Sequence, residues 1–241
     1  MVTNDTTSEL HEHRSRLLQA MAGVSASKGV AAATIADIVR EAGVSKRTFY
    51  EHFDCKETCF LTLYRLTSAS ALRTLREAVQ PDRPWQTQVE HALDAYFAHL
   101  AAGPGLVGTL FVEIHHLGPE GLRVRREVMA QFADFVLETV NGGPGSGGVP
   151  LSQVLTPTMA LAAVGGINEL VMLAIERGEV DRLQELTPSA SAVVPGCWAT
   201  ISTSRLALSR PTLSWRASTR VAVSRRCSAA DCSSARLSVK P

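Results

Sequence analysis

Apolar residues recur with a helical period along most of the first 186 positions of this 241-residue chain. The pattern is densest in residues 34–57, TIADIVREAGVSKRTFYEHFDCKE. Its first half has the i, i+3, i+4, i+7 spacing of a helix with one buried face, at Ile35, Ile38, Val39 and Ala42. Thr34 stands where a hydroxyl caps the start of a helix, and Gly43 stands where a left-handed residue ends one.

A second short helix is predicted to begin just after Gly43, because Ser45 is a favourable N-cap residue. Apolar side chains available for a core are Val44, Phe49 and Phe53. Polar side chains are expected to face outward at Lys46, Arg47, Thr48, Tyr50 and His52. Two short helices joined by a tight glycine-containing turn predict a helix-turn-helix, whose second helix can enter the major groove of DNA.

Further apolar stripes predict helices over residues 10–28, 56–79, 85–102, 106–117, 119–140 and 156–177. No convincing run of alternating strands precedes residue 190, so the expected fold is all-α. We expect a disordered start, a three-helix head, a larger helical domain and an anomalous tail, over residues 1–9, 10–55, 56–186 and 187–241.

The chemistry of the helix-turn-helix suits DNA, because affinity for DNA comes largely from contacts with its phosphates. The residues expected to contact the DNA backbone are Thr34, Ser45, Tyr50, His52 and Lys56. The residues expected to face the bases are Lys46, Arg47 and Thr48. Taken singly, Thr34 and Ser45 also fit plain helix caps, Tyr50 fits a partly buried aromatic residue, and His52, Lys46 and Arg47 fit solvated surface positions. The ordered combination is what favours DNA binding.

This combination resembles the N-terminal DNA-binding domain of the TetR family of bacterial transcriptional regulators. The resemblance covers about residues 10–66 and is carried by Thr34, Ile35, Ala36, Ile38, Ala42, Gly43, Val44, Ser45, Thr48, Tyr50, His52, Phe53, Lys56 and Glu57. It implies a repressor that binds a palindromic operator in double-stranded DNA as a homodimer and is released by a small-molecule effector. It also implies that residues 56–186 form the effector-binding and dimerisation domain.

The family usually dimerises through its last two long helices. Here residues 156–177 are a credible first partner, because small side chains allow close helix approach at Ala160, Ala162, Ala163, Gly165 and Gly166. The last helix should lie in the tail, where no helical period is found. A glycine-rich connection at residues 142–148 also departs from the family pattern.

Charge is distributed unevenly along the chain. Residues 1–186 carry 16 basic and 22 acidic residues, whereas residues 187–241 carry 8 basic residues and one acidic residue. DNA affinity of the first part must therefore come from a local patch. The tail, with 12 serines, fits either a basic disordered segment or a stretch whose reading frame has been lost, as in a regulator with a disrupted C-terminus.

The start of the chain lacks the features of a signal peptide, and no transmembrane helix is predicted, so the expected setting is the cytoplasm without membrane contact.

Aromatic and polar residues that could line a ligand pocket are Trp85, Tyr96, Phe97, Phe111, His115 and Phe132. The alternative for each aromatic residue is simple core packing. No cofactor, metal site or catalytic motif is predicted, which disfavours the remaining alternative of a small helical enzyme.

Overall fold

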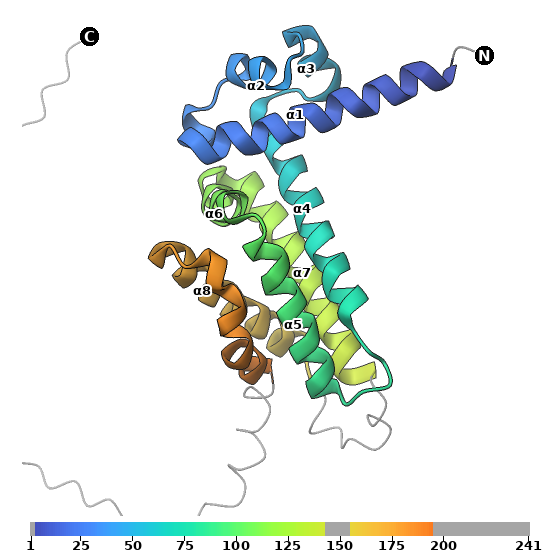
Figure 1. The fold of residues 1–241 in the computed structure, drawn as a ribbon, viewed down its shortest axis with the longest axis vertical. Coiled ribbons are helices and arrows are strands. Elements are labelled where there is room, and N and C mark those ends of the chain that lie inside the picture. The colour runs from blue at the N-terminus through green and yellow to red at the C-terminus, as the bar shows by residue number, and fades with distance from the viewer. Residues whose placement is uncertain (1–2, 143–154, 195–241) are drawn as a thin grey trace, which may run out of the picture. The chain divides into compact units, whose positions relative to one another are not determined.

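The computed structural model describes residues 3–142 and 155–194 of the chain (Figure 1). Within these two ranges the regular elements are all helices, and no strand occurs. The predicted all-α fold, with an N-terminal helix-turn-helix and a larger helical domain, is confirmed.

The first helix, α1 (Thr3–Ala32), is longer than the sequence predicts. Residues 3–9 belong to it, so their assignment to a disordered start is wrong. Polar residues without an apolar period gave no sign of this, but extending an existing helix costs much less than nucleating one. Near the other end, Gly29 adopts φ 76° and ψ 159°, which interrupts the helical backbone where the sequence predicts a stop.

The helix-turn-helix consists of α2 (Ile35–Ala42) and α3 (Lys46–His52). The Thr34 side chain accepts the backbone N–H of Asp37, and the Asp37 carboxylate accepts that of Thr34, which makes a reciprocal capping box. Gly43 ends α2 with φ 62° in the left-handed region. Ser45 then caps α3 by accepting the backbone N–H of Thr48 at 3.0 Å. These caps and the glycine fix the turn between the two helices.

The larger domain comprises α4 (Lys56–Ala78), α5 (Trp85–Ala101), α6 (Pro104–Glu113), a 3₁₀ turn η1 (Ile114–His116), α7 (Gly118–Gly142), α8 (Pro157–Arg177) and a 3₁₀ segment η3 (Val180–Leu186). The helix predicted over residues 106–117 is thus divided, because α6 gives way to η1. α4 packs against α5, α7 packs against α8, and α1 packs against α6. Figure 1 shows α4 running from the head along the larger domain.

Two hydrophobic cores form, and their border does not follow the predicted domain boundary at residues 55 and 56. The core beneath the helix-turn-helix contains Phe49 of α3, as expected, and Phe60 of α4. It also contains Leu110, Ile114 and Val124, from α6, η1 and α7. The second core lies among α4, α5, α7 and α8. The head is therefore built partly from residues far along the chain.

The helical structure continues past η3 through residues 187–194, where Ala190 and Val194 are buried in the second core. The first eight residues of the predicted anomalous tail are therefore a packed helix, which the sequence analysis missed. Val193 packs closely over Gly166 of α8, in keeping with the small residue there. Residues 195–241, and all of the predicted glycine-rich connection beyond Gly142, lie outside the described residues.

α8 is long and apolar enough to cross a bilayer by length and composition, as is the sharply bent pair of α5 and α6 if it is taken as one span. Core helices of soluble proteins share this property. In this chain Ala163, Ile167 and Val171 of α8 are buried, and the helix packs against α7 and η3.

Candidate DNA-binding surface and effector cavity

The side chains of α3 that were expected to face DNA are open to solvent. Lys46 is exposed, the Arg47 side chain is 90% exposed, and Tyr50 is 57% exposed. Arg47 donates from Nε to a carboxylate oxygen of Glu51, one turn along, at 3.1 Å. A guanidinium held at one end in this way still presents its other N–H groups outward.

The two hydroxyls at the start of α3 bond to each other, and the Ser45 hydroxyl also accepts the backbone N–H of Thr48. The Ser45 and Thr48 oxygens lie 2.9 Å apart, and Ser45 is exposed. The structure therefore brings together Ser45, Lys46, Arg47 and Thr48 on the exposed first turn of the second helix of the motif. This is the part of a helix-turn-helix that contacts base edges and adjacent phosphates.

A charged cluster that the sequence analysis did not identify surrounds the start of α2. The Asp37 carboxylate accepts Lys28 Nζ at 2.6 Å, Arg40 Nη2 at 2.8 Å and the Thr34 hydroxyl at 2.6 Å. Hydrogen bonds from Lys28 and then Thr34 hold the pKa of Asp37 well below its usual range. Thr34 is thereby placed next to two cations, each of which has solvent access.

Lys56 has a different environment from the one predicted. Its ammonium donates to three backbone carbonyls at the end of α1: Val30 at 2.8 Å, Ala31 at 2.9 Å and Ala33 at 2.7 Å. An ammonium has three N–H donors, so all of them are used within the protein. Lys56, the first residue of α4, thus ties α4 to the end of α1 and has no donor left for a phosphate.

His52 is only partly suited to the predicted phosphate contact. Its Nε2 atom is buried and has no hydrogen-bond partner among the described residues. Burial, reinforced by nearby His13, lowers the pKa of His52, which favours the neutral ring. A contact with DNA in this conformation would have to use the other ring nitrogen.

One hydrogen bond connects the end of α1 to the end of α6. The Glu113 carboxylate accepts the backbone N–H of Val30 at 3.0 Å. A Cβ placed on Gly29 would lie 3.0 Å from the same carboxylate, so the close approach depends on that glycine. The two partners are 83 residues apart in sequence, and no local pattern marks the pair.

The larger domain encloses a cavity of about 450 Å³, within the range of small-molecule sites. Of the predicted pocket residues, the wall includes Tyr96, Phe111, His115 and Phe132. Phe97 is fully buried in the second core and is absent from the wall, so its assignment to the pocket is wrong. The side chain of Trp85 lies outside the described structure.

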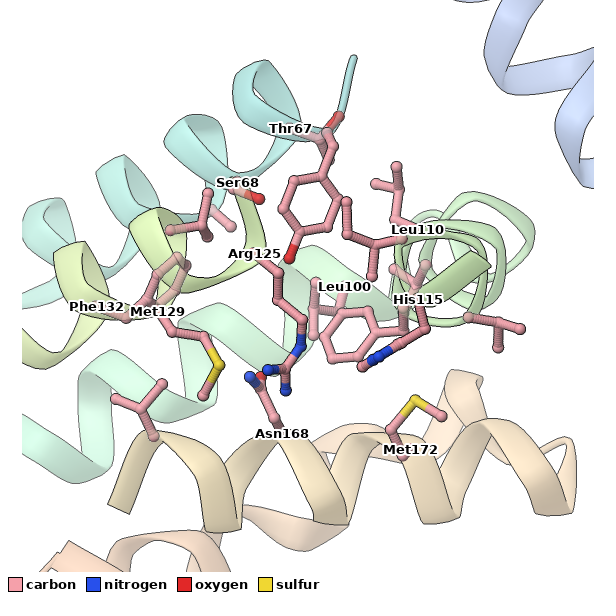
Figure 2. A pocket seen from close by; sticks show the side chains of 18 of the residues that line it. Thr67, Ser68, Leu100, Leu110, His115, Arg125, Met129, Phe132, Asn168 and Met172 are labelled. Carbon is pink, nitrogen blue, oxygen red and sulfur yellow. The ribbon is translucent and has the colours of Figure 1, made fainter. Parts of the chain in front are cut away.

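Several polar wall residues escaped the sequence analysis, among them Arg125 of α7 and Asn168 of α8 (Figure 2). Arg125 lies within the run RVRRE, where nothing in the pattern distinguishes it from the arginines on either side. Burial, together with Arg125, lowers the pKa of His115. Glu113 and His116 approach only to 4.0 Å, and no group of three potential metal ligands occurs in the described ranges.

Residues 17–63 match the family model described as bacterial regulatory proteins, tetR family. No curated protein matches the chain by sequence. Its fold is similar to that of the fatty acid degradation regulator FadR from Bacillus halodurans, at 19% identity and TM-score 0.68 over 76% of this chain and 95% of that one.

Two further solved structures have the same fold. FadR from Bacillus subtilis, in complex with stearoyl-CoA, is 20% identical with TM-score 0.65, over 75% of this chain and 97% of that one. SmeT, the repressor of the Stenotrophomonas maltophilia multidrug efflux pump SmeDEF, is 16% identical with TM-score 0.58, over 77% of this chain and 89% of that one. The resemblance to the tetR family of bacterial regulatory proteins is thus confirmed for the helix-turn-helix segment, residues 17–63, and the likeness to the solved structures is one of fold.

Proposed function

We propose that this regulator is a repressor that binds a palindromic operator as a homodimer and leaves it when a small molecule occupies the cavity. The observation that carries the proposal is the position of Leu110 and Ile114. Both side chains belong to the core beneath the helix-turn-helix, and both also line the cavity. Protein cores are close-packed, so a ligand that displaces either side chain also disturbs the packing of the head.

The bond between Glu113 and Val30 supports the same route. Glu113 is the last residue of α6 and lies next to Ile114, so the cavity wall and the anchor of α1 are adjacent in sequence. A ligand shifts the equilibrium only if it binds the DNA-incompetent arrangement more tightly than the competent one. The proposal therefore requires two arrangements of η1, of which the cavity ligand favours one.

For DNA recognition we retain the exposed first turn of α3. Lys46, Arg47 and Thr48 face the bases, and a bidentate arginine contact with guanine contributes about 1–3 kcal/mol of discrimination. Thr34, Ser45 and Tyr50 bind the DNA backbone. His52 binds it through Nδ1, the ring nitrogen other than the buried Nε2. Lys56 is removed from this set, because its three donors are bonded to carbonyls.

For dimerisation we propose the outer face of α8. Leu161 and Leu173 are 45% and 39% exposed, and both belong to the few large hydrophobic side chains exposed among the described residues. Exposed Ala162 and half-buried Gly165 lie on the same face and allow close approach of a second helix. Exposed leucines beside small residues are typical of a helix that packs against a partner subunit, and the exposed Glu169 and Glu176 would add charged groups to this interface.

Two structural neighbours are compatible with this reading. The Bacillus subtilis FadR structure contains stearoyl-CoA, a small molecule with a long apolar chain. SmeT is described as a repressor. Both proteins share the fold of this chain, at 20% and 16% identity.

Selection of DNA from a random pool by the purified full-length protein tests the proposal. The expected result is enrichment of an inverted repeat whose half-sites are separated by about one or two helical turns. The Arg47→Ala variant should select the same repeat with relaxed preference at one position of each half-site. A pool without enrichment would overturn the proposed operator binding. A mass by light scattering equal to that of one chain would overturn the proposed dimer.

A further inference from the structure

Arg125 places a positive charge in the wall of the cavity. Its side chain is half-buried and extends from α7 into the cavity toward Asn168, as Figure 2 shows. Among the described residues, no carboxylate lies within 4.0 Å of the Arg125 guanidinium, and no hydrogen bond uses it. Its neighbour Arg123 contrasts with it, because Arg123 pairs with both Glu120 and Glu127.

The surroundings of Arg125 are largely apolar, with Leu100, Phe111, Met129 and Phe132 in the same wall. A partly desolvated charge without a partner is unfavourable, and a carboxylate from a ligand would compensate for the lost hydration. The planar guanidinium presents paired N–H donors that match a carboxylate in a bidentate arrangement. The shape and charge of Arg125 thus favour an anionic headgroup.

Neighbouring polar groups fit the same headgroup. Asn168 supplies an amide toward which Arg125 points, and His115 lies on the adjacent side of the cavity (Figure 2). Two acidic residues, Glu169 and Glu176, also line the cavity, but both are exposed on α8. The half-buried charge in the wall is therefore positive, whereas the two negative charges belong to exposed residues of α8.

The apolar lining continues beyond this cavity. A second, smaller cavity of about 40 Å³ shares Tyr96, Phe132 and Asn168 with the first, and is lined further in by Leu75 and Val89. The rings of Tyr96 and Phe132 pack edge to face with centroids 5.9 Å apart, at the boundary that the two cavities share. A ligand with its headgroup at Arg125 could direct an apolar chain along this lining.

We infer that the cavity takes an apolar carboxylate, whose anionic group pairs with Arg125 and whose hydrocarbon part packs against Tyr96, Phe111 and Phe132. This inference rests on the proposed effector-binding role of the cavity and names the chemical class of the effector. Arg125 is the residue that selects for the anion, and the aromatic wall selects for an apolar chain.

Calorimetry with the full-length protein tests the inference, with sodium octanoate, octan-1-ol and octylamine as probes of equal chain length. Octanoate should bind at least about tenfold more tightly than the alcohol or the amine, because a charged hydrogen bond contributes more than a neutral one. Butyrate should bind more weakly than octanoate, by up to about fourfold for each CH₂ removed.

The matched variants are Arg125→Gln and Arg126→Gln. Arg126 is the next residue of α7, is exposed and is absent from the cavity wall. Arg125→Gln should lose the preference for octanoate over octan-1-ol, whereas Arg126→Gln should keep it. Arg125→Lys retains the charge but lacks the planar guanidinium, so it should keep part of the preference for octanoate. It serves as a second variant in case Arg125→Gln fails to fold.

Three outcomes would overturn the inference: no binding of octanoate to the wild-type protein, tighter binding of octylamine, or equal affinity of wild type and Arg125→Gln for octanoate. Operator binding is measured separately by DNA selection. If the protein selects an operator but binds no carboxylate, only the proposed ligand class is refuted. If it binds octanoate through Arg125 but selects no DNA, the proposed regulator function is refuted and the ligand class stands.

Discussion

Glu113 and Val30 are joined by a hydrogen bond of 3.0 Å from the Val30 backbone N–H to the Glu113 carboxylate. The carbonyl of Val30 in turn accepts Lys56 Nζ at 2.8 Å. Both backbone polar groups of one residue at the end of α1 are thus bonded to side chains, one from α6 and one from α4. The position of α1 relative to the larger domain depends on these two bonds and on the shared packing of Leu110 and Ile114.

Gly29 and Gly23 provide a matched pair of glycine substitutions in α1. Gly29→Ala should destabilise the protein by about 1–3 kcal/mol, because its backbone region is nearly exclusive to glycine and the new Cβ would press on Glu113. Gly23→Ala should stabilise it by about 0.5–1 kcal/mol, because Gly23 lies within a helix with nothing within 4 Å of the added Cβ. Urea unfolding measures both changes, and equal shifts in the two variants would contradict this account of Gly29.

Lys56 and Lys46 distinguish a structural lysine from a DNA-contacting one. Lys56→Ala should lower the free energy of unfolding by about 1–3 kcal/mol, because it removes the charged donor from three carbonyls at the end of α1. Lys46→Ala should leave stability nearly unchanged, weaken binding to the selected operator and relax the preference for one base pair of each half-site. Unfolding curves and DNA selection with each variant check the pair. A Lys56→Ala protein of unchanged stability would show that its three bonds contribute little.

Asp37 gives a prediction for pH. Hydrogen bonds from Lys28 and Thr34 lower its pKa in the folded state below the unfolded value of about 3.9, so the ionised carboxylate favours folding. This contribution is complete above about pH 5 and is lost progressively as the pH falls through the folded-state pKa. The thermal midpoint of Asp37→Asn should therefore lie below that of the wild type at pH 7, with the gap narrowing at acidic pH. Asp134→Asn, at an exposed position of α7, is the control, and a gap of constant size would contradict the assignment.

Local signals predicted the helix-turn-helix well. Thr34, Gly43 and Ser45 act within one or two turns of the chain, so their capping roles could be predicted before any tertiary contact was known. The periodic stripes of the later helices predicted those elements in the same way, whereas the short helix at residues 187–194 is hidden in a serine-rich context.

Features that depend on distant residues could not be predicted. Lys56 was assigned to DNA because nothing in the sequence indicates that the end of α1 lies beside it. Phe97 and Phe111 looked alike as pocket candidates, yet only Phe111 lines the cavity, because the orientation of each helix is set by its neighbours. Arg125 resembles any surface arginine until α7 is placed against α8.

The central claim is that occupancy of the cavity controls the affinity of the head for DNA. The most direct measurement is the dissociation constant for the selected operator, obtained by fluorescence anisotropy at fixed salt with and without sodium octanoate at a concentration that calorimetry shows to be saturating. The account predicts that octanoate weakens operator binding by about 5- to 150-fold in the wild type and has no such effect on Arg125→Gln at the same concentration. Saturated cavity binding with unchanged operator affinity would contradict it.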